Sequence, residues 1–193
     1  MIKRFFDIFV SFLGLIIASP ILLPVIFLVW RQDKKFPFYI APRSGKHEKE
    51  FKMVKLRSMV VDADKTGVDS VSTNDIRITQ IGHFIRKYKL DEITQLWNVL
   101  KGDMSLVGPR PDISGYADKL KGEDRKILKL RPGITGTASL KYVNEEEILD
   151  AQDDAQKYND EVIWPDKVNI NRDYILNYQF TNDLRYIWQT LKK

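Results

Sequence analysis

The hydrophobic pattern of the chain opens with one long apolar segment. Residues 8–30 form a run of 23 positions without a charged side chain, and charged residues flank this run on both sides. A straight helix needs about 20 apolar residues to cross the hydrocarbon core of a bilayer, so the run is long enough to do so. Its length and the absence of a small-residue cleavage site argue against a secretory signal peptide.

Two prolines interrupt this apolar run, Pro20 in its middle and Pro24 one helical turn later. A proline inside a helix removes a hydrogen bond and clashes with the preceding turn, so the pattern predicts a bend at Ser19-Pro20. The Ser19 hydroxyl is well placed to bond a carbonyl that this break frees within lipid. Because both flanks are cationic, charge gives no preferred orientation across a membrane. We therefore predict a re-entrant helix that enters and leaves the cytoplasmic leaflet, with a kinked single-pass helix as the alternative.

The pattern then changes to short alternating segments followed by helical spacing. Residues 36–41 and 51–56 read as two strands of a β-hairpin, joined by a polar, turn-rich connection at 42–47. Apolar residues recur at helical spacing over residues 75–100. We expect Gly82 and the junction at 89–91 to divide that stretch into two helices.

The second half of the chain contains two turns rich in glycine and proline, at 101–111 and 131–136, with a further helix between them. Residues 145–158 read as an acidic, solvated helix. A last helix, from about 171 to 191, carries an aromatic stripe that serves packing or rests at a lipid interface: Tyr174, Tyr178, Phe180, Tyr186 and Trp188. The predicted fold class is α+β and mainly helical, with residues 1–33 as the membrane helix and its basic flanks and residues 34–193 as one integrated domain.

Composition narrows the chemistry that the 193 residues can support. The chain has no cysteine and two histidines, which excludes disulfides and thiolate metal sites and argues against an imidazole-based zinc site. Any bound metal is therefore expected to be a hard ion such as Mg²⁺ with carboxylate ligands. The net charge of +5 is concentrated in residues 1–60, which hold 11 Lys or Arg against four Asp or Glu. This distribution suits an anionic membrane surface better than a nucleic-acid groove.

Two adjacent carboxylates, Asp91 and Glu92, stand where a helix is predicted to begin. A structural explanation is that Asp91 caps the helix and Glu92 complements its dipole. The functional explanation is a phosphate site, because helix N-termini favour anions. Basic residues that match phosphate lie nearby in sequence or on the rigid turns: Lys55, Arg57, Arg86, Lys87, Lys89, Arg110 and Arg131.

Several established nucleotide and hydrolase signatures are missing from the chain. Neither the Gly-x-Gly-x-x-Gly nor the Gly-x₄-Gly-Lys-Ser/Thr pattern occurs, which argues against Rossmann and P-loop mechanisms. No Ser/His/Asp set has usable spacing, and His47 and His83 read as surface or packing residues.

Taken together, the motifs resemble those of one family, the monotopic phosphoglycosyl transferases of the bacterial sugar transferase family. The resemblance runs from Lys3 to Thr190, and its motifs stand in the family's order. They are Lys3-Arg4 with Asp7, the Ser19-Pro20 break, residues 51–59, 77–79, 90–92, 98–105, 108–111 and 131–136, and Asp183. It implies a small cytoplasmic catalytic domain held by a re-entrant helix at the bacterial inner membrane, and Mg²⁺ dependence.

By motif position, the resemblance assigns Asp91 as the nucleophile and Glu92 as its acidic neighbour, with Mg²⁺ held by Glu92 and by Asp91 or Asp183. Asp183 is carried over as a further functional acid and Arg110 as the arginine of the Pro-Arg-Pro turn. The chain departs from the family at Thr94, where a proline is usual. It also departs at Asn171, where relatives often carry aspartate. Residues 138–142 replace a common motif, so the sugar specificity of relatives does not transfer.

The resemblance implies that a sugar 1-phosphate passes from a UDP-sugar to undecaprenyl phosphate through an aspartyl-phosphosugar, with release of UMP. This is the first membrane step in bacterial polysaccharide or glycoprotein assembly. The implied partners are the UDP-sugar, undecaprenyl phosphate and membrane lipid, without nucleic acid, and downstream glycosyltransferases remain open as further partners. A membrane-tethered binding or scaffold module is the alternative from another class, and a nucleic-acid binder is the weaker one.

Overall fold

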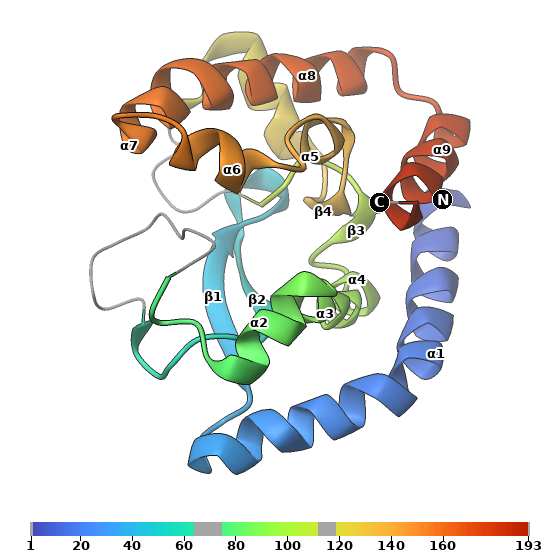
Figure 1. The fold of residues 1–193 in the computed structure, drawn as a ribbon. Coiled ribbons are helices and arrows are strands. Elements are labelled where there is room, and N and C mark those ends of the chain that lie inside the picture. Colours follow the sequence, from blue (N-terminus) through green and yellow to red (C-terminus); the bar gives the residue numbers. More distant parts are fainter. Residues whose placement is uncertain (1, 64–74, 112–118, 193) are drawn as a thin grey trace.

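The computed structural model describes residues 2–63, 75–111 and 119–192, and the described part is mainly helical with two small sheets (Figure 1). This agrees with the predicted α+β class. The α-helices are α1 (Ile2–Asp33), α2 (Gln80–Lys87), α3 (Leu90–Ile93), α4 (Leu96–Lys101), α5 (Thr137–Lys141), α6 (Glu145–Asp150), α7 (Ala155–Tyr158), α8 (Trp164–Leu176) and α9 (Phe180–Leu191). The strands are β1 (Phe38–Ser44), β2 (Glu50–Leu56), β3 (Ser105–Val107) and β4 (Gly133–Thr135), and the 3₁₀ and π segments are η1 (Lys46–Glu48), η4 (Gly122–Lys129) and η5 (Asn159–Ile163).

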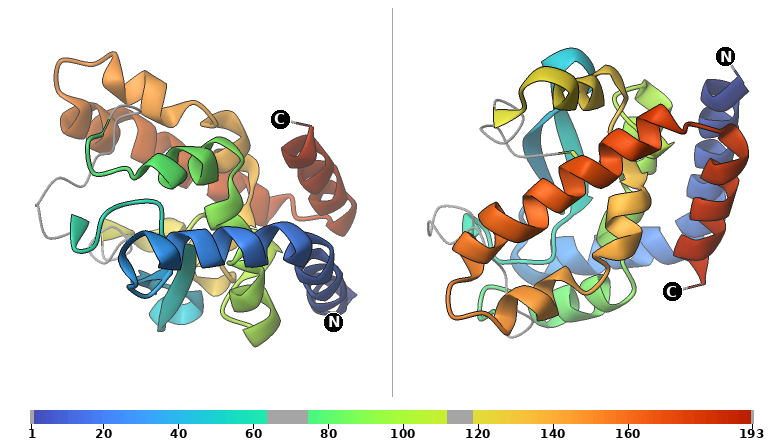
Figure 2. Two further views of the ribbon diagram at one scale, coloured as in Figure 1. Left: turned by 60° about the horizontal axis from the view of Figure 1, so that its bottom comes forward. Right: turned by 90° about the horizontal axis from the view of Figure 1, so that it is seen from above.

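Helix α1 is one continuous helix that bends in its middle part, so that two arms run along the rest of the molecule (Figures 1 and 2). Pro20 and Pro24 both lie inside it. The missing N–H of Pro20 leaves the Ile16 carbonyl without its helical partner. The Ser19 hydroxyl donates a hydrogen bond to that carbonyl at 2.7 Å, as the sequence predicted. Among the described residues, α1 is the one helix long and apolar enough to cross a membrane.

Both arms of α1 contribute to hydrophobic cores of the molecule. Phe6 and Val10 of the first arm pack against the core that contains Val99, Met104 and Tyr174. Val25 and Val29 of the second arm join a second core, which also includes Leu56, Ile85 and Leu90. The opposite face of α1 stays exposed and apolar.

The hairpin of β1 and β2 confirms the predicted pairing, and the strands extend beyond the predicted limits. The two strands are antiparallel with Phe38 opposite Leu56 and Ser44 opposite Glu50. Pro42 lies within β1, opposite Lys52, although the sequence placed it in the turn. The residues between the strands form η1 instead of an irregular turn.

The predicted junction at 89–91 is confirmed, because it separates α2 from α3, but the predicted number of two helices over residues 75–100 is wrong, since the structure has three shorter ones. The first helix starts at Gln80, where the Thr79 side chain caps it by accepting a hydrogen bond from the Gly82 amide at 3.0 Å. Gly82 lies inside α2 and does not end a helix. A Cβ at this position would lie 1.8 Å from the Ser58 carbonyl oxygen, so the glycine allows two backbones to approach closely.

The predicted C-terminal elements are also shorter than expected. The acidic helix divides into α6 and α7, because the Asp154 side chain caps a new helix by accepting from the Lys157 amide at 2.9 Å. The last predicted helix divides into α8 and α9, since Gln179 has an extended backbone. The turn brings Asp183 back to the hydroxyl of Tyr174, which one straight helix would not allow. The further helix expected before residue 131 is the 3₁₀ segment η4, and residues 112–118 lie outside the described part.

Candidate active site

The Asp91-Glu92 pair lies on α3, a helix of four residues. The N-cap position of α3 is occupied by Lys89 and not by Asp91. Lys89 has a left-handed backbone (φ 53°), and its side chain makes no hydrogen bond to the helix. The structural explanation that Asp91 serves as the helix cap is therefore wrong. So short a helix has a small dipole, and neighbouring side chains set the electrostatics of the pair.

Two cations from separate parts of the chain meet the carboxylates. The Lys55 ammonium of β2 lies 3.9 Å from a carboxylate oxygen of Asp91 and 3.9 Å from one of Glu92. The Arg110 guanidinium donates a hydrogen bond of 2.9 Å to Glu92 Oε1. Arg86 also contributes, because its positive charge lowers the pKa of Asp91. The structure thus brings together five predicted residues from β2, α2, α3 and the turn after β3.

The two carboxylates have opposite pKa shifts. Burial raises the pKa of Asp91, and the negative charge of Glu92 adds to this effect while Lys55 opposes it. Burial would raise the pKa of Glu92 as well, but Arg110 and Lys55 outweigh it and hold that pKa below its ordinary value. The environments of the two carboxylates thus differ, because burial dominates at Asp91 and the two cations dominate at Glu92.

One oxygen of Asp91 has no hydrogen-bond partner within the described part of the chain. Asp91 Oδ1 is buried and accepts no hydrogen bond from any residue that the structure describes. A buried carboxylate oxygen without a donor is costly unless it meets a ligand or reacts. Burial, together with the charge of Arg110, also lowers the pKa of Lys55, which faces the same space.

The position of Lys55 depends on two polar side chains that bond the preceding residue, Val54. The Val54 amide donates to Asn98 Oδ1 at 2.9 Å, and the Val54 carbonyl accepts from the Thr94 hydroxyl at 3.1 Å. Asn98 also donates to the Lys52 carbonyl at 2.7 Å. Side chains of α4 and of the α3–α4 junction thus take the place of a third strand beside β2.

Local sequence signals do not single out either positioning residue. Thr94 stands where the family usually has proline, and Asn98 is one member of a longer motif. Both side chains are buried, with Asn98 0% exposed. A polar residue on the apolar side of a helix was the signal that could have identified them, because buried amides and hydroxyls need partners.

Arg110 is held by a close crossing of two glycine-rich turns. The Gly108 amide donates to the Thr135 carbonyl at 2.9 Å, and the Gly133 amide donates to the Pro109 carbonyl at 2.7 Å. A Cβ on Gly133 would lie 2.1 Å from the Gly108 nitrogen, so a larger residue would separate the turns. The parallel pair of β3 and β4 leads into this crossing and fixes the start of the loop that carries Arg110.

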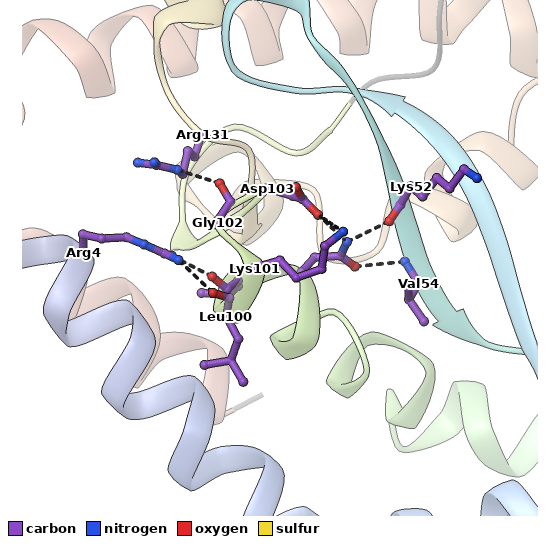
Figure 3. Close-up of polar contacts among 10 residues, drawn as sticks. Arg4, Lys52, Val54, Leu100, Lys101, Gly102, Asp103 and Arg131 are labelled. Carbon is purple, nitrogen blue, oxygen red and sulfur yellow. Dashed lines mark hydrogen bonds and ion pairs between the residues drawn. The ribbon is translucent and has the colours of Figure 1, made fainter.

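Arg131 and Arg4 of α1 both bond backbone carbonyls at the C-terminal end of α4 (Figure 3). Arg131 donates to the Gly102 carbonyl at 2.8 Å, and Arg4 donates to the carbonyls of Val99 and Leu100 at 2.6 and 3.0 Å. Cations at a helix C-terminus satisfy free carbonyls and complement the dipole. Burial and the nearby Arg131 lower the pKa of Arg4. The observed contacts of Arg131 stabilise α4 and do not include the Asp91-Glu92 pair.

Arg57 is likewise engaged away from the carboxylate pair. Its guanidinium forms a two-point ion pair with Asp33, at 2.5 and 2.8 Å, which ties the end of α1 to the end of β2. Arg57 is buried, so this ion pair is part of the packing between α1 and the hairpin of β1 and β2.

Asp183 of α9 lies beside the N-terminal end of α1, the end opposite to Asp33. Its buried carboxylate pairs with Lys3 and accepts hydrogen bonds from the hydroxyls of Tyr174, at 2.7 Å, and Tyr178, at 3.4 Å. Burial and this carboxylate raise the pKa of Tyr178 to about 12 and also raise that of Tyr174. The observed partners of Asp183 therefore join α1, α8 and α9. None of them is one of the residues grouped around Asp91, which are Lys55, Arg86, Glu92 and Arg110.

The carboxylate pair has the donor chemistry that Mg²⁺ requires. No group of three or more acidic or histidine side chains within metal-binding reach occurs among the described residues. Mg²⁺ usually binds through one or two carboxylates together with waters and substrate phosphates. Asp91 and Glu92, with the free Asp91 Oδ1, fit that arrangement.

Comparison with known proteins identifies relatives over the whole chain. The profile of the family described as bacterial sugar transferase matches residues 1–193. A putative undecaprenyl-phosphate N-acetylgalactosaminyl 1-phosphate transferase of Bacillus subtilis is 43% identical over 63% of this chain and 68% of its own length. An uncharacterized sugar transferase of the same organism, EpsL, is 32% identical over 100% of this chain and 87% of its own length.

A longer relative covers almost the whole of this chain. The undecaprenyl-phosphate galactose phosphotransferase of Salmonella typhimurium is 35% identical over 99% of the chain. The chain spans 40% of the length of that protein. The shared segment includes α1, Asp91 and the residues grouped around Asp91.

Proposed function

This chain belongs to the bacterial sugar transferase family, as its motifs predicted, and we propose that it transfers a sugar 1-phosphate from a UDP-sugar to undecaprenyl phosphate. Family membership makes it a sugar-phosphate transferase and sets aside the alternatives of a scaffold module and a nucleic-acid binder. The donor and acceptor are inferred from the names of the relatives, which include a galactose and a putative N-acetylgalactosaminyl 1-phosphate transferase.

The observation that carries this proposal is the environment of Asp91. Its carboxylate is buried, keeps one oxygen free of partners among the described residues, and lies 3.9 Å from the Lys55 ammonium. Carboxylates act as covalent nucleophiles in other phosphoryl transfers when neighbouring groups hold them in place. Glu92 is engaged by Arg110 and is therefore less available to attack.

In the first step, an oxygen of Asp91 attacks the phosphorus that carries the sugar. The new bond from Asp91 to phosphorus forms as the bond to the bridging oxygen breaks, and UMP departs with that oxygen and its electron pair. Lys55 and Arg110 face the non-bridging oxygens, where positive charge stabilises the transition state. Arg110 is half exposed, so it can move from Glu92 to the incoming diphosphate.

In the second step, a phosphate oxygen of undecaprenyl phosphate attacks the same phosphorus. The bond to Asp91 breaks, the carboxylate is regenerated, and the product is an undecaprenyl diphosphate sugar. Asp91 and Glu92 would hold Mg²⁺, which supplies charge neutralisation on the diphosphate when bound.

We further propose that α1 enters the cytoplasmic face of the inner membrane and returns to the same side. Near its start, Arg4 bonds the end of α4. At its end, Asp33 pairs with Arg57 of the globular part. Because both ends of the apolar run contact one domain, a spanning arrangement would have to break one set of contacts. This geometry supports a re-entrant helix that keeps Asp91 close to a lipid phosphate.

Label retention tests the covalent step. The purified enzyme with a UDP-sugar labelled in the sugar should keep label after denaturation, whereas the Asp91→Asn variant should keep none. Asp153→Asn, an exposed aspartate on another segment, is the matched control and should retain label. Normal turnover of Asp91→Asn, or kinetics that require both substrates to bind before UMP leaves, would overturn the proposal.

Reporters fused to either end of the chain test the topology. Both should read cytoplasmic in the native sequence. Replacing Pro20 and Pro24 together with leucine removes the bend, at a gain of about 3 kcal/mol of helix stability per interior proline, and should shift the population toward a spanning form. Reporters on opposite sides in the native sequence would establish a single pass.

A further inference from the structure

The C-terminal helix α9 carries an exposed apolar stripe that the proposed transfer reaction does not use. Leu184, Trp188 and Leu191 follow one another at helical spacing, so they share one face of α9. Their exposed fractions are 41%, 60% and 76%. Scattered exposed apolar residues need no explanation, but a stripe of large ones along one helix indicates an interaction surface.

The start of α9, from which this stripe runs, lies against the N-terminal end of α1. Figures 1 and 2 show the start of α9 close to the N-terminal end of α1. The ring of Phe180 packs edge-on against the ring of Phe6 at 5.4 Å, and Asp183 pairs with Lys3. The neighbouring α1 residues Ile2 and Phe5 are exposed at 76% and 73%. Exposed apolar side chains of both helices, Leu184 among them, therefore lie near this contact.

Basic residues border the stripe on the side away from α1. Arg185 and Lys192 are exposed, and the Lys192 ammonium lies 4.9 Å from the centre of the Trp188 ring. Helical spacing places both cations within about a third of a turn of Leu184 and Trp188. An apolar stripe with tryptophan and a cationic border is the composition of helices that lie in a membrane interface. Anionic lipid complements that border.

We propose that α9 is a second membrane contact, with Leu184, Trp188 and Leu191 in the boundary between headgroups and acyl chains and with Arg185 and Lys192 at the anionic headgroups. This inference rests on the proposed membrane insertion of α1. The re-entrant helix is already joined to the domain at both of its ends, and a second contact beside its start further limits how the domain tilts on the lipid surface. The domain then has one orientation relative to the lipid surface.

The absence of native cysteine permits a direct test by single labelling. Leu184→Cys and Trp188→Cys, in the full chain, are each labelled with an environment-sensitive fluorophore. The protein is then placed in vesicles of phosphatidylcholine and phosphatidylglycerol in equal parts that contain a nitroxide lipid. The α9 positions should be quenched to a similar degree as Phe9→Cys, which reports the exposed face of α1.

Gln189→Cys is the matched control, since Gln189 follows Trp188 but lies beside Leu140 and Lys141 of α5. It should show little quenching. If Phe9→Cys is quenched and both α9 positions are not, the inference about α9 is overturned while the insertion of α1 stands. If Phe9→Cys is not quenched either, the proposed membrane insertion itself fails. Energy transfer between labelled copies, without lipid quenching, would overturn the inference in favour of a self-association surface.

Discussion

The Thr94 hydroxyl donates a hydrogen bond of 3.1 Å to the carbonyl oxygen of Val54, forty residues earlier in the chain. The same hydroxyl lies 2.9 Å from the Asp91 carbonyl. It therefore links the backbone that carries the nucleophile to the strand that carries Lys55. Where relatives often have proline, this chain has a side chain that makes a specific contact.

We predict that Thr94→Val lowers kcat/KM by about tenfold, equivalent to roughly 1.4 kcal/mol of transition-state stabilisation. Valine keeps the shape but loses the donor, so β2 can shift relative to α3 and displace Lys55 from the carboxylates. Release of UMP from the UDP-sugar in the presence of undecaprenyl phosphate measures the rate. Thr94→Ser keeps the hydroxyl and should restore most of the activity; equal loss in both variants would contradict the role of the hydrogen bond.

We predict that Asn98→Ala lowers the free energy of unfolding by about 2 kcal/mol or more, because it leaves the Val54 amide and the Lys52 carbonyl without partners inside the protein. Asn144→Ala is the matched control. Asn144 is exposed and its side chain makes no capping bond, so its change should stay within about 0.5 kcal/mol. Denaturant unfolding in detergent, followed by circular dichroism, compares the two variants.

We predict that Lys55→Met moves the acidic limb of the pH profile of kcat/KM to higher pH. Burial raises the pKa of Asp91, and the positive charge of Lys55 opposes that rise. Removing the charge lets the pKa of Asp91 rise further, so the carboxylate ionises only at higher pH. The profile of kcat/KM reports groups of the free enzyme.

Lys52→Met is the control for that pH profile, because Lys52 is exposed and its side chain points to the other face of β2. Its acidic limb should match that of the native enzyme. An unchanged limb in Lys55→Met would mean that the charge of Lys55 does not control the ionisation of the nucleophile.

We predict that the ion pair of Asp33 and Arg57 makes the fold lose stability in acid. The hydrogen bonds from Arg57 lower the pKa of Asp33 from 3.8 to about 2. A depressed pKa in the folded state stabilises the fold above the unfolded-state pKa, and that contribution disappears as the pH falls from about 4 to about 2. Asp33→Asn should remove this part of the pH dependence of thermal unfolding, while Asp153→Asn should keep it.

Local signals along the chain predicted the long apolar helix, the hairpin and three residues of the candidate site. The uncharged run of 23 residues, its two prolines and the Ser19 hydroxyl predicted a long apolar helix with a hydrogen bond at its break. The alternation before residue 57 predicted the hairpin. Adjacent carboxylates and a proline-flanked arginine identified Asp91, Glu92 and Arg110 as one candidate site. Each of these features depends on residues close together in sequence, where periodicity and spacing carry the information.

The tertiary structure alone decided which charged residues share a site. Lys55 on β2 and Arg57 just after the strand stand two positions apart, yet Lys55 faces Asp91 and Arg57 pairs with Asp33. Asp183 has the type of side chain that could hold a metal, but the turn between α8 and α9 places it against Lys3, 180 residues away. Partner choice among charged side chains follows from packing of distant segments, and no local pattern encodes that packing.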